Sequence, residues 1–137
     1  MKSVQLVGPE HIHAVWEIVW PMLNVAFINY ENPDYGVNHL KADVINSKQT
    51  LFVVMENDKI IGAYTIEFIN YPNHRVAHIT AIGGKAMITK ETVEQCEDWA
   101  RTNGATKIRA FAQDTQARLF KLKMGLEKVT NVVEKNI

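Results

Sequence analysis

Cysteine is almost absent from this chain of 137 residues, where Cys96 is the single occurrence. One cysteine excludes an internal disulfide and any zinc site built on a cysteine cluster, and it fits a reducing compartment. Cys96 shares one predicted helical face with Val93 and Trp99, so we interpret it as a core residue. The chain is nevertheless long enough to bury a core without disulfides or metal.

The chain also lacks an excess of charge of either sign. Its 15 basic residues balance 15 acidic ones. Without a net field there is no general attraction to nucleic acid or to an anionic membrane, so we expect neither partner. No apolar run approaches the length of a membrane span. Since no linker or repeat divides the sequence, we expect a single cytoplasmic domain covering residues 1–137.

Hydrophobic periodicity and turn residues predict ten secondary-structure elements. Pro21 lies inside the first helical pattern and predicts a kink or break near Trp20. Gly104 is typical of a helix C-terminal cap. The expected order is a strand at residues 3–7, helices at 10–23 and 37–47, strands at 51–55, 60–69 and 75–82, a helix ending at 103, a strand at 106–112, a helix at 115–123 and a strand at 126–133.

This order, β-α-α-β-β-β-α-β-α-β, predicts an α+β protein. The middle strands form an antiparallel meander, and a strand–helix–strand crossover follows it. Such a combination gives a mixed sheet with helices on its faces. A cofactor would lie at the carboxyl ends of the strands, where one strand diverges from its neighbour.

A glycine pair, Gly83-Gly84, ends the third strand of the meander and precedes a helix. Glycine lets backbone N–H groups approach an anion, and a helix N-terminus adds a favourable dipole. The pattern therefore predicts a phosphate site, with a β-bulge or tight turn as the alternative. Lys85 follows directly and can meet a phosphate as a point charge or face solvent.

Three local patterns resemble the GNAT superfamily of acyl-CoA-dependent N-acyltransferases. Residues 51–54 and 59–63 are similar to its central hairpin, and residues 114–126 to its Asn-x-x-Ala…Tyr-x-x-x-Gly-Phe stretch. Residues 81–86, Ala-Ile-Gly-Gly-Lys-Ala, are similar to its pyrophosphate loop, Gln/Arg-x-x-Gly-x-Gly/Ala, with Gly84 and Ala86 in the small-residue positions. The resemblance covers most of the chain and implies a GNAT-like fold.

The resemblance implies acetyl transfer from acetyl-CoA, the co-substrate, to the amine of a small molecule or peptide. Direct attack in a ternary complex would be helped by oriented amides near the strand end. A homodimer is also compatible with it. The residues implied to bind the cofactor are Ala81, Ile82, Gly83, Gly84, Lys85 and Ala86.

Glu67 and His78 are the candidates for taking the proton of the amine, because they lie on the two strands expected to border the acceptor. The alternatives are an outward strand position for Glu67 and a half-buried structural role for His78. Tyr30, Tyr35 and Tyr71 lie in loops and are candidates for lining the substrate, although tyrosine also tolerates surfaces well.

Two positions depart from the family pattern. Ala81 replaces the polar residue that opens the loop pattern, and Lys121 stands where many members carry a tyrosine that protonates the departing thiolate. Lysine donates a proton usefully only if its pKa is lowered. The departures predict weak or lost activity, and they leave open whether the protein is an enzyme or a CoA sensor.

The chain also resembles short GNAT-like proteins encoded by tailed bacteriophages. This likeness implies an alternative, a non-catalytic structural or interaction protein with virion proteins as partners. The histidines show no spacing typical of metal ligands, so we expect no metal site. A run of basic residues near the end is typical of a solvated helix face: Arg118, Lys121, Lys123 and Lys128.

Overall fold

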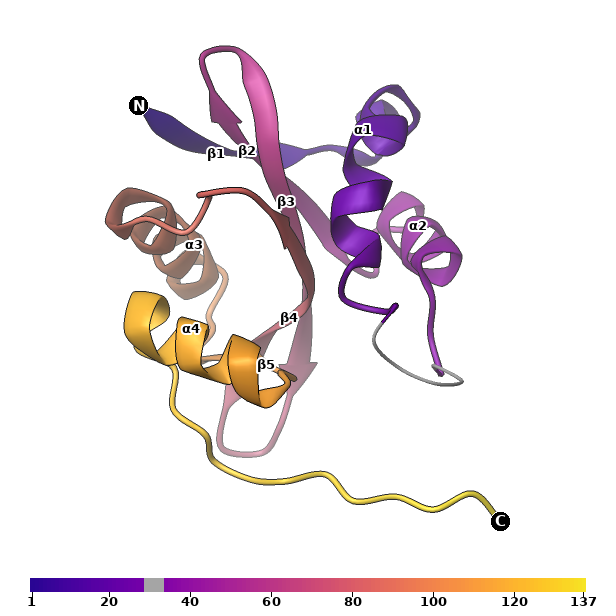
Figure 1. Ribbon diagram of the computed structural model, residues 1–137, viewed down its shortest axis with the longest axis vertical. Helices are drawn as coiled ribbons and strands as arrows, with labels where there is room; N and C mark the ends of the chain where they lie inside the picture. Colours follow the sequence, from indigo (N-terminus) through magenta and orange to yellow (C-terminus); the bar gives the residue numbers. More distant parts are fainter. Residues whose placement is uncertain (29–33) are drawn as a thin grey trace.

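The computed structural model describes residues 1–28 and 34–137. Five strands form one sheet, with two helices against one face and two against the other (Figure 1). The strands are β1 (Lys2–Val7), β2 (Thr50–Glu56), β3 (Lys59–Asn70), β4 (Arg75–Gly84) and β5 (Lys107–Ala110). A short 3-10 turn, η1 (Pro9–His11), precedes the helices α1 (Ile12–Asn24), α2 (Val37–Ile45), α3 (Lys90–Thr102) and α4 (Asp114–Met124).

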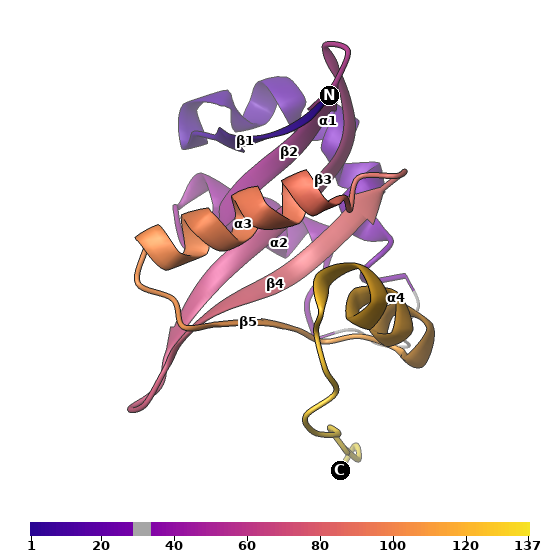
Figure 2. The ribbon, with the colours of Figure 1, turned by 90° about the vertical axis from the view of Figure 1, so that its left-hand side faces the viewer.

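The strands are ordered in the sheet as they are in the chain, β1 to β5. The first four pair antiparallel, and β5 joins β4 in parallel after the α3 crossover. This is the mixed α+β sheet that the sequence predicts. Figure 2 shows β4 and β5 running apart from their shared end.

Each face of the sheet carries its own apolar core. The core on the α1/α2 face includes Leu23 and Leu40 from the helices, with Leu51 and Ala81 from the strands. The core on the α3/α4 face is built on stacked aromatic rings. Trp99 of α3 lies edge-on to Phe52 at 4.6 Å between ring centroids, and tilted against Phe68 at 5.3 Å. Trp99 is half-buried, whereas Cys96 is buried as predicted.

The break predicted near Trp20 does not occur, because helix α1 continues through Pro21 to Asn24. A kink at this position stays a prediction. Proline removes one intrahelical hydrogen bond, which normally disfavours this position. Here Val19 and Leu23, on either side of Pro21, are fully buried against the sheet. We infer that this packing outweighs the missing hydrogen bond.

The strand predicted at residues 126–133 does not form. After α4 the chain ends in an irregular, extended segment that leaves the body of the protein (Figure 1). Its apolar residues Val129, Val132 and Val133 are exposed. A strand needs apolar residues at alternate positions to bury one face, and a spacing of three places Val129 and Val132 on opposite faces. β-propensity alone therefore does not attach this segment to the sheet.

The remaining predicted elements are confirmed with shifts of one or two residues at their ends. Gly104 and Gly125 both adopt positive φ angles, 86° and 71°, after α3 and α4. Within residues 1–28 and 34–137, no helix combines the length and apolar character required to cross a membrane.

Candidate active site

A β-bulge in β4 opens the centre of the sheet. The register between β3 and β4 passes from Ile66 opposite Ile79 to Thr65 opposite Ala81, so Thr80 is the extra residue. Parallel pairing of β4 with β5 ends at Ile79. Beyond the bulge, the part of β4 that faces β5 has no ladder partner among the described residues. Its backbone N–H groups are consequently available to a ligand.

The end of β4 requires glycine because the backbone is crowded there. A Cβ on Gly83 would collide with the carbonyl of Met22 at the end of α1. Gly84 has a φ of 137°, and a Cβ there would collide with Gly62 of β3. Met87 folds back onto the same place, since a Cβ on Gly62 would strike its sulfur. The glycine pair thus brings the loop close to β3.

The backbone amides of the loop after β4 differ in whether they already have a hydrogen-bond acceptor. The N–H of Lys85 donates to the carbonyl of Ile61 at 3.1 Å, which takes it out of any anion cradle. Ala86 has a positive φ of 52°. The hydrogen bonds among the described residues include none donated by the amides of Ala86, Met87 or Ile88. These three amides therefore remain available to a ligand.

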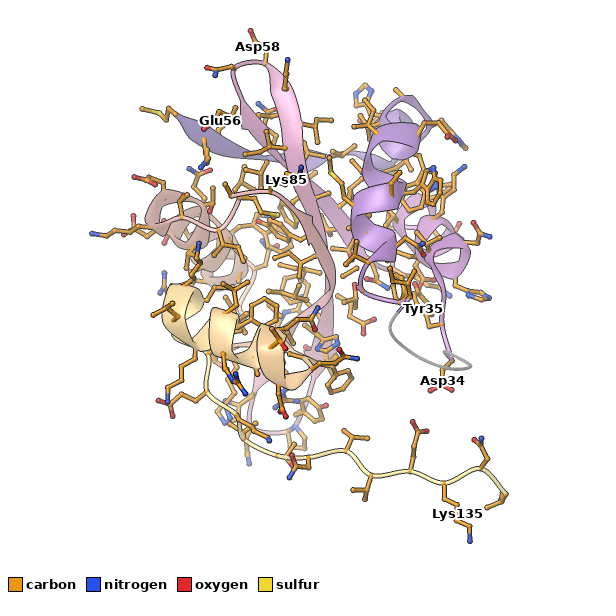
Figure 3. The ribbon with its side chains drawn as sticks, in the orientation of Figure 1. Asp34, Tyr35, Glu56, Asp58, Lys85 and Lys135 are labelled. Atoms are coloured by element: carbon orange, nitrogen blue, oxygen red, sulfur yellow. The ribbon has the colours of Figure 1, made fainter. Side chains whose placement is uncertain are left out.

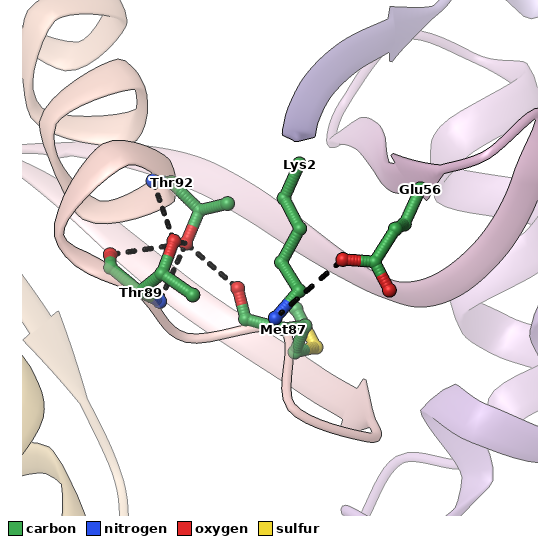
Figure 4. Close-up of polar contacts among 5 residues, drawn as sticks. All are labelled: Lys2, Glu56, Met87, Thr89 and Thr92. Atoms are coloured by element: carbon green, nitrogen blue, oxygen red, sulfur yellow. Dashed lines mark hydrogen bonds and ion pairs between the residues drawn. The ribbon is translucent and has the colours of Figure 1, made fainter.

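Helix α3 begins immediately behind the loop, with a threonine at each end of its first turn. The hydroxyl of Thr89 accepts from the N–H of Thr92, and the hydroxyl of Thr92 accepts from the N–H of Thr89 and donates to the carbonyl of Met87 at 2.7 Å (Figure 4). These bonds fix the loop onto the helix start, where the dipole favours an anion. Hydrogen bonds to its own backbone N–H and to Thr89 lower the pKa of the exposed Glu91 carboxyl.

Positive charge lies beside this helix start. Lys2 forms an ion pair with Glu56 at 3.8 Å, close to the threonine pair (Figure 4). Lys85 is exposed in the loop itself, well separated in Figure 3 from Tyr35 and Asp34 near the start of α2. The loop and the first turn of α3 therefore combine unpaired amides, a helix dipole and an exposed lysine.

A small apolar cavity of about 20 Å³ lies behind the loop, between β4, α3 and α4. That volume holds one water molecule at most. The hydroxyl of Tyr64 is buried there without a hydrogen-bond partner among the described residues. Burial is the first cause that raises the pKa of Tyr64 and also that of the neighbouring Cys96. The cavity is lined by Val54, Tyr64, Ile79, Ile82, Met87, Ile88, Thr92, Val93, Cys96 and Met124.

The opposite face of the sheet brings Glu67 and His78 together. They are direct cross-strand partners in β3 and β4, so their side chains are neighbours on one face. Burial, and then the charge of Asp43, raise the pKa of Glu67. Burial, and then the charge of Arg109, lower the pKa of His78. Both shifts favour the neutral forms.

A buried chain of hydrogen bonds connects α2 to the β-bulge. Tyr35 donates its hydroxyl hydrogen to Asp43 at 2.6 Å, and Gln49 donates to the Tyr35 oxygen at 3.0 Å. The oxygen of Gln49 accepts from the hydroxyl of Thr80 in the bulge, which also contacts the Thr65 hydroxyl at 2.6 Å. Burial, followed by Asp43, raises the pKa of Tyr35, and Glu67 adds to this shift. Tyr35 therefore lies near both carboxylates.

The other candidates lie apart from this cluster. Tyr71 is exposed at the β3–β4 turn, where Arg109 covers its ring at 5.4 Å. Tyr30 lies outside the described residues. Lys121 is exposed on the last turn of α4 and does not line the cavity. Within the described ranges, no three potential ligand side chains gather as a metal site.

Sequence reasoning missed four residues of this arrangement: Asp43, Gln49, Thr80 and Met87. The first three come together through the register of β3 with β4 and through a hydrogen bond between residues 31 positions apart. Neither of these can be recognised from the neighbouring sequence. The Thr-x-x-Thr spacing of Thr89 and Thr92 is a local signal typical of a helix N-terminus.

Solved structures share the fold of this chain, although no protein-family model and no curated protein sequence matches it. A predicted acetyltransferase from Clostridium acetobutylicum, solved with acetyl-CoA, aligns at 19% identity and a TM-score of 0.67, covering 99% of this chain and 96% of its own. The fold is the GNAT fold. An aminoglycoside acetyltransferase from a soil metagenome, solved with sisomicin, aligns at 13% identity and a TM-score of 0.69, over 99% and 95%.

A third structure with the GNAT fold is an aminoglycoside N-acetyltransferase in complex with CoA. It aligns at 13% identity with a TM-score of 0.66, covering all of this chain and 95% of its own. At these identities the likeness establishes the architecture alone.

Proposed function

We propose that this protein transfers an acetyl group from acetyl-CoA to an amine. The observation that carries the proposal is the divergence of β4 from β5 after Thr80, with an anion-binding loop on one side and Glu67 with His78 on the other. A thioester at the divergence would lie between the cofactor loop and a proton acceptor. The fold shared with acetyl-CoA-bound and CoA-bound structures supports this reading.

On the cofactor side, the pyrophosphate would bind the unpaired amides of Ala86 to Ile88 and the first turn of α3. Lys85 would supply a nearby positive charge. In this proposal, Gly83 and Gly84 allow the loop to approach β3 closely, and the phosphates are held mainly by other amides. Of Ala81 and Ile82, just beyond the bulge, the residue whose backbone N–H points away from β3 would direct it at the thioester carbonyl.

On the acceptor side, Glu67 or His78 would take the proton of the amine, directly or through a water molecule. The amine nitrogen attacks the thioester carbon, an N–C bond forms, the C–S bond breaks and CoA leaves as the thiolate. Because Lys121 is exposed and does not line the cavity, we propose that solvent supplies the proton of the thiolate. A thiol with a pKa of about 8.5 needs little help to leave at neutral pH.

Acetyl-CoA binding tests the cofactor side. At 100 times the dissociation constant, a ligand of the folded state stabilises it by about 2.7 kcal/mol, which raises the Tm by about 8 °C for a domain of this size. Lys85→Glu should weaken binding about tenfold, and Lys59→Glu at the exposed start of β3 is the matched control. An absence of any shift at millimolar acetyl-CoA contradicts the proposal.

A second candidate function is a non-catalytic GNAT-fold protein, such as a structural or interaction protein of a bacteriophage particle. The exposure of Lys121, at the position where the family resemblance implies a thiolate-protonating tyrosine, favours it. Release of free CoA thiol across a panel of amines separates the two candidates. Binding of acetyl-CoA without turnover of any amine would support the non-catalytic one.

A further inference from the structure

Two half-buried carboxylates, Asp43 and Glu67, lie near each other without a counter-ion. The Gln49 amide donates to Asp43, and the Gln49 oxygen accepts from Thr80, whose hydroxyl contacts that of Thr65. Thr65 lies two positions before Glu67 in β3, so the hydrogen-bonded chain from Asp43 reaches the face of the sheet that carries Glu67. In agreement with this geometry, the charge of Asp43 contributes to raising the pKa of Glu67. The ion pairs among the described residues include neither of them. Half-buried carboxylates normally gain a cation or a set of hydrogen bonds.

Within residues 1–28 and 34–137, the basic side chains around this pair have other contacts, although the charge of Arg109 reaches His78 beside Glu67. Residues 14–38 contain no Lys, Arg or His. His39 of α2 accepts a hydrogen bond at Nδ1 from the N–H of Gly36, and its ring packs 5.6 Å from that of Tyr35. Lys41 extends toward the Trp16 ring, and Arg109 of β5 lies over the ring of Tyr71.

Asp43 is held in a fixed position by its neighbours. The Tyr35 hydroxyl donates to it at 2.6 Å and the Gln49 amide at 3.3 Å. The side-chain hydrogen bonds among the described residues include none to Glu67, so Asp43 is the better-positioned of the two carboxylates to hold a ligand group.

His78 gives an independent indication of a ligand on this face. It is only 5% exposed, and its Nδ1 has no hydrogen-bond partner among the described residues. As the cross-strand partner of Glu67, it lies on the same face of the sheet. A buried ring nitrogen without a partner is costly, and an N–H or O–H group of a bound molecule would satisfy it.

We propose that the acceptor carries at least two amino groups, of which one reacts beside Glu67 and His78 and a second, as an ammonium, is held by Asp43. This inference rests on the proposed acetyl transfer. A monoamine would leave one carboxylate unpaired after binding, whereas a diamine neutralises both. The ring of Tyr35, beside both carboxylates, provides an apolar surface for the chain between the amines.

The reaction balances without a further reagent. The reacting amine must be neutral at attack, so it loses one proton before or during formation of the N–C bond. Glu67 accepts that proton and returns it to solvent, and CoA leaves as the thiolate. The second ammonium takes no part in the reaction and keeps its proton throughout.

Matched amines test the proposal in the intact chain. We expect kcat/KM for 1,4-diaminobutane to exceed that for butylamine and 4-amino-1-butanol at least tenfold, which corresponds to about 1.4 kcal/mol. Asp43→Asn keeps an acceptor for the Tyr35 hydroxyl and should bring the ratio near one, chiefly through KM. Asp58→Asn, at the exposed β2–β3 turn, is the isosteric control and should preserve the ratio. High salt should reduce it in the wild type.

If the protein does not catalyse acetyl transfer, binding of the diamine can still be measured and tests the inference by itself. The Tm of the wild type should rise with millimolar 1,4-diaminobutane and not with butylamine, and Asp43→Asn should lose the rise. Equal rates and equal Tm shifts for diamine and monoamine overturn this inference while leaving acetyl transfer intact. If no amine is acetylated but the diamine still binds, and Asp43→Asn abolishes that binding, then the transferase proposal is wrong and the inference of a diamine site stands.

Discussion

Replacing Gln49 by leucine should lower the free energy of unfolding, because this one buried side chain makes three hydrogen bonds. Gln49 is 4% exposed and connects Tyr35, Asp43 and Thr80 through three hydrogen bonds. Each bond contributes about 1 kcal/mol net, and the apolar leucine recovers part of this loss through burial. Tyr35 keeps its bond to Asp43, and Thr80 keeps its contact with Thr65. We therefore expect a loss of about 2 kcal/mol.

Urea unfolding followed by circular dichroism measures this loss, and the Tm should fall by about 6 °C. Gln5→Leu, on the exposed side of β1, is the matched control and should stay within about 0.5 kcal/mol of the wild type. Thr80→Val should be destabilising as well, and the double variant should lose less than the sum of the two single losses. A loss below about 0.5 kcal/mol for Gln49→Leu, or strict additivity, would refute the link between α2 and the bulge.

Three further predictions concern other parts of the molecule. Trp99→Ala should cost about 2–3 kcal/mol in urea unfolding, less than for a fully buried aromatic, because Trp99 is half-buried. Gly83→Ala should lower the Tm far more than Gly125→Ala, because only the former collides with backbone, while the latter bears about 1 kcal/mol of left-handed strain. Because the pKa of Glu67 is raised, the folded state holds its proton more tightly than the unfolded state does. The free energy of unfolding therefore falls as pH rises above about 4.5. Glu67→Gln should remove this part of the fall, so its advantage over the wild type should appear at pH 7 and vanish below pH 4.

Sequence patterns predicted the elements whose signals are local. The apolar run of β3, the helical spacing around Cys96 and the glycine after α3 each act within a few residues. Gly83 and Gly84 were singled out for their phosphate-binding character. The structure adds that they are required by close approach to α1 and β3, a reason that depends on parts of the chain 20 to 60 positions away.

The missed features are products of tertiary packing. Pro21 is tolerated because buried neighbours hold α1 on the sheet, and the segment after α4 stays out of the sheet despite its valines. The bulge at Thr80 exists only as a mismatch between two strands, so no property of residue 80 itself predicts it. Whether Glu67, His78 and Lys121 act in catalysis stays a prediction.

The agreement between strand order and chain order has a consequence for synthesis on the ribosome. Every member of the core on the α1/α2 face lies at or before Ala81, so this core is complete once β4 has emerged. The core on the other face waits for α3, β5 and α4. A nascent chain can therefore complete the core on the α1/α2 face first, while the α3/α4 face of the sheet is still uncovered. Aromatic residues such as Phe52 and Tyr64 then remain open to chaperones or to self-association until α3 arrives.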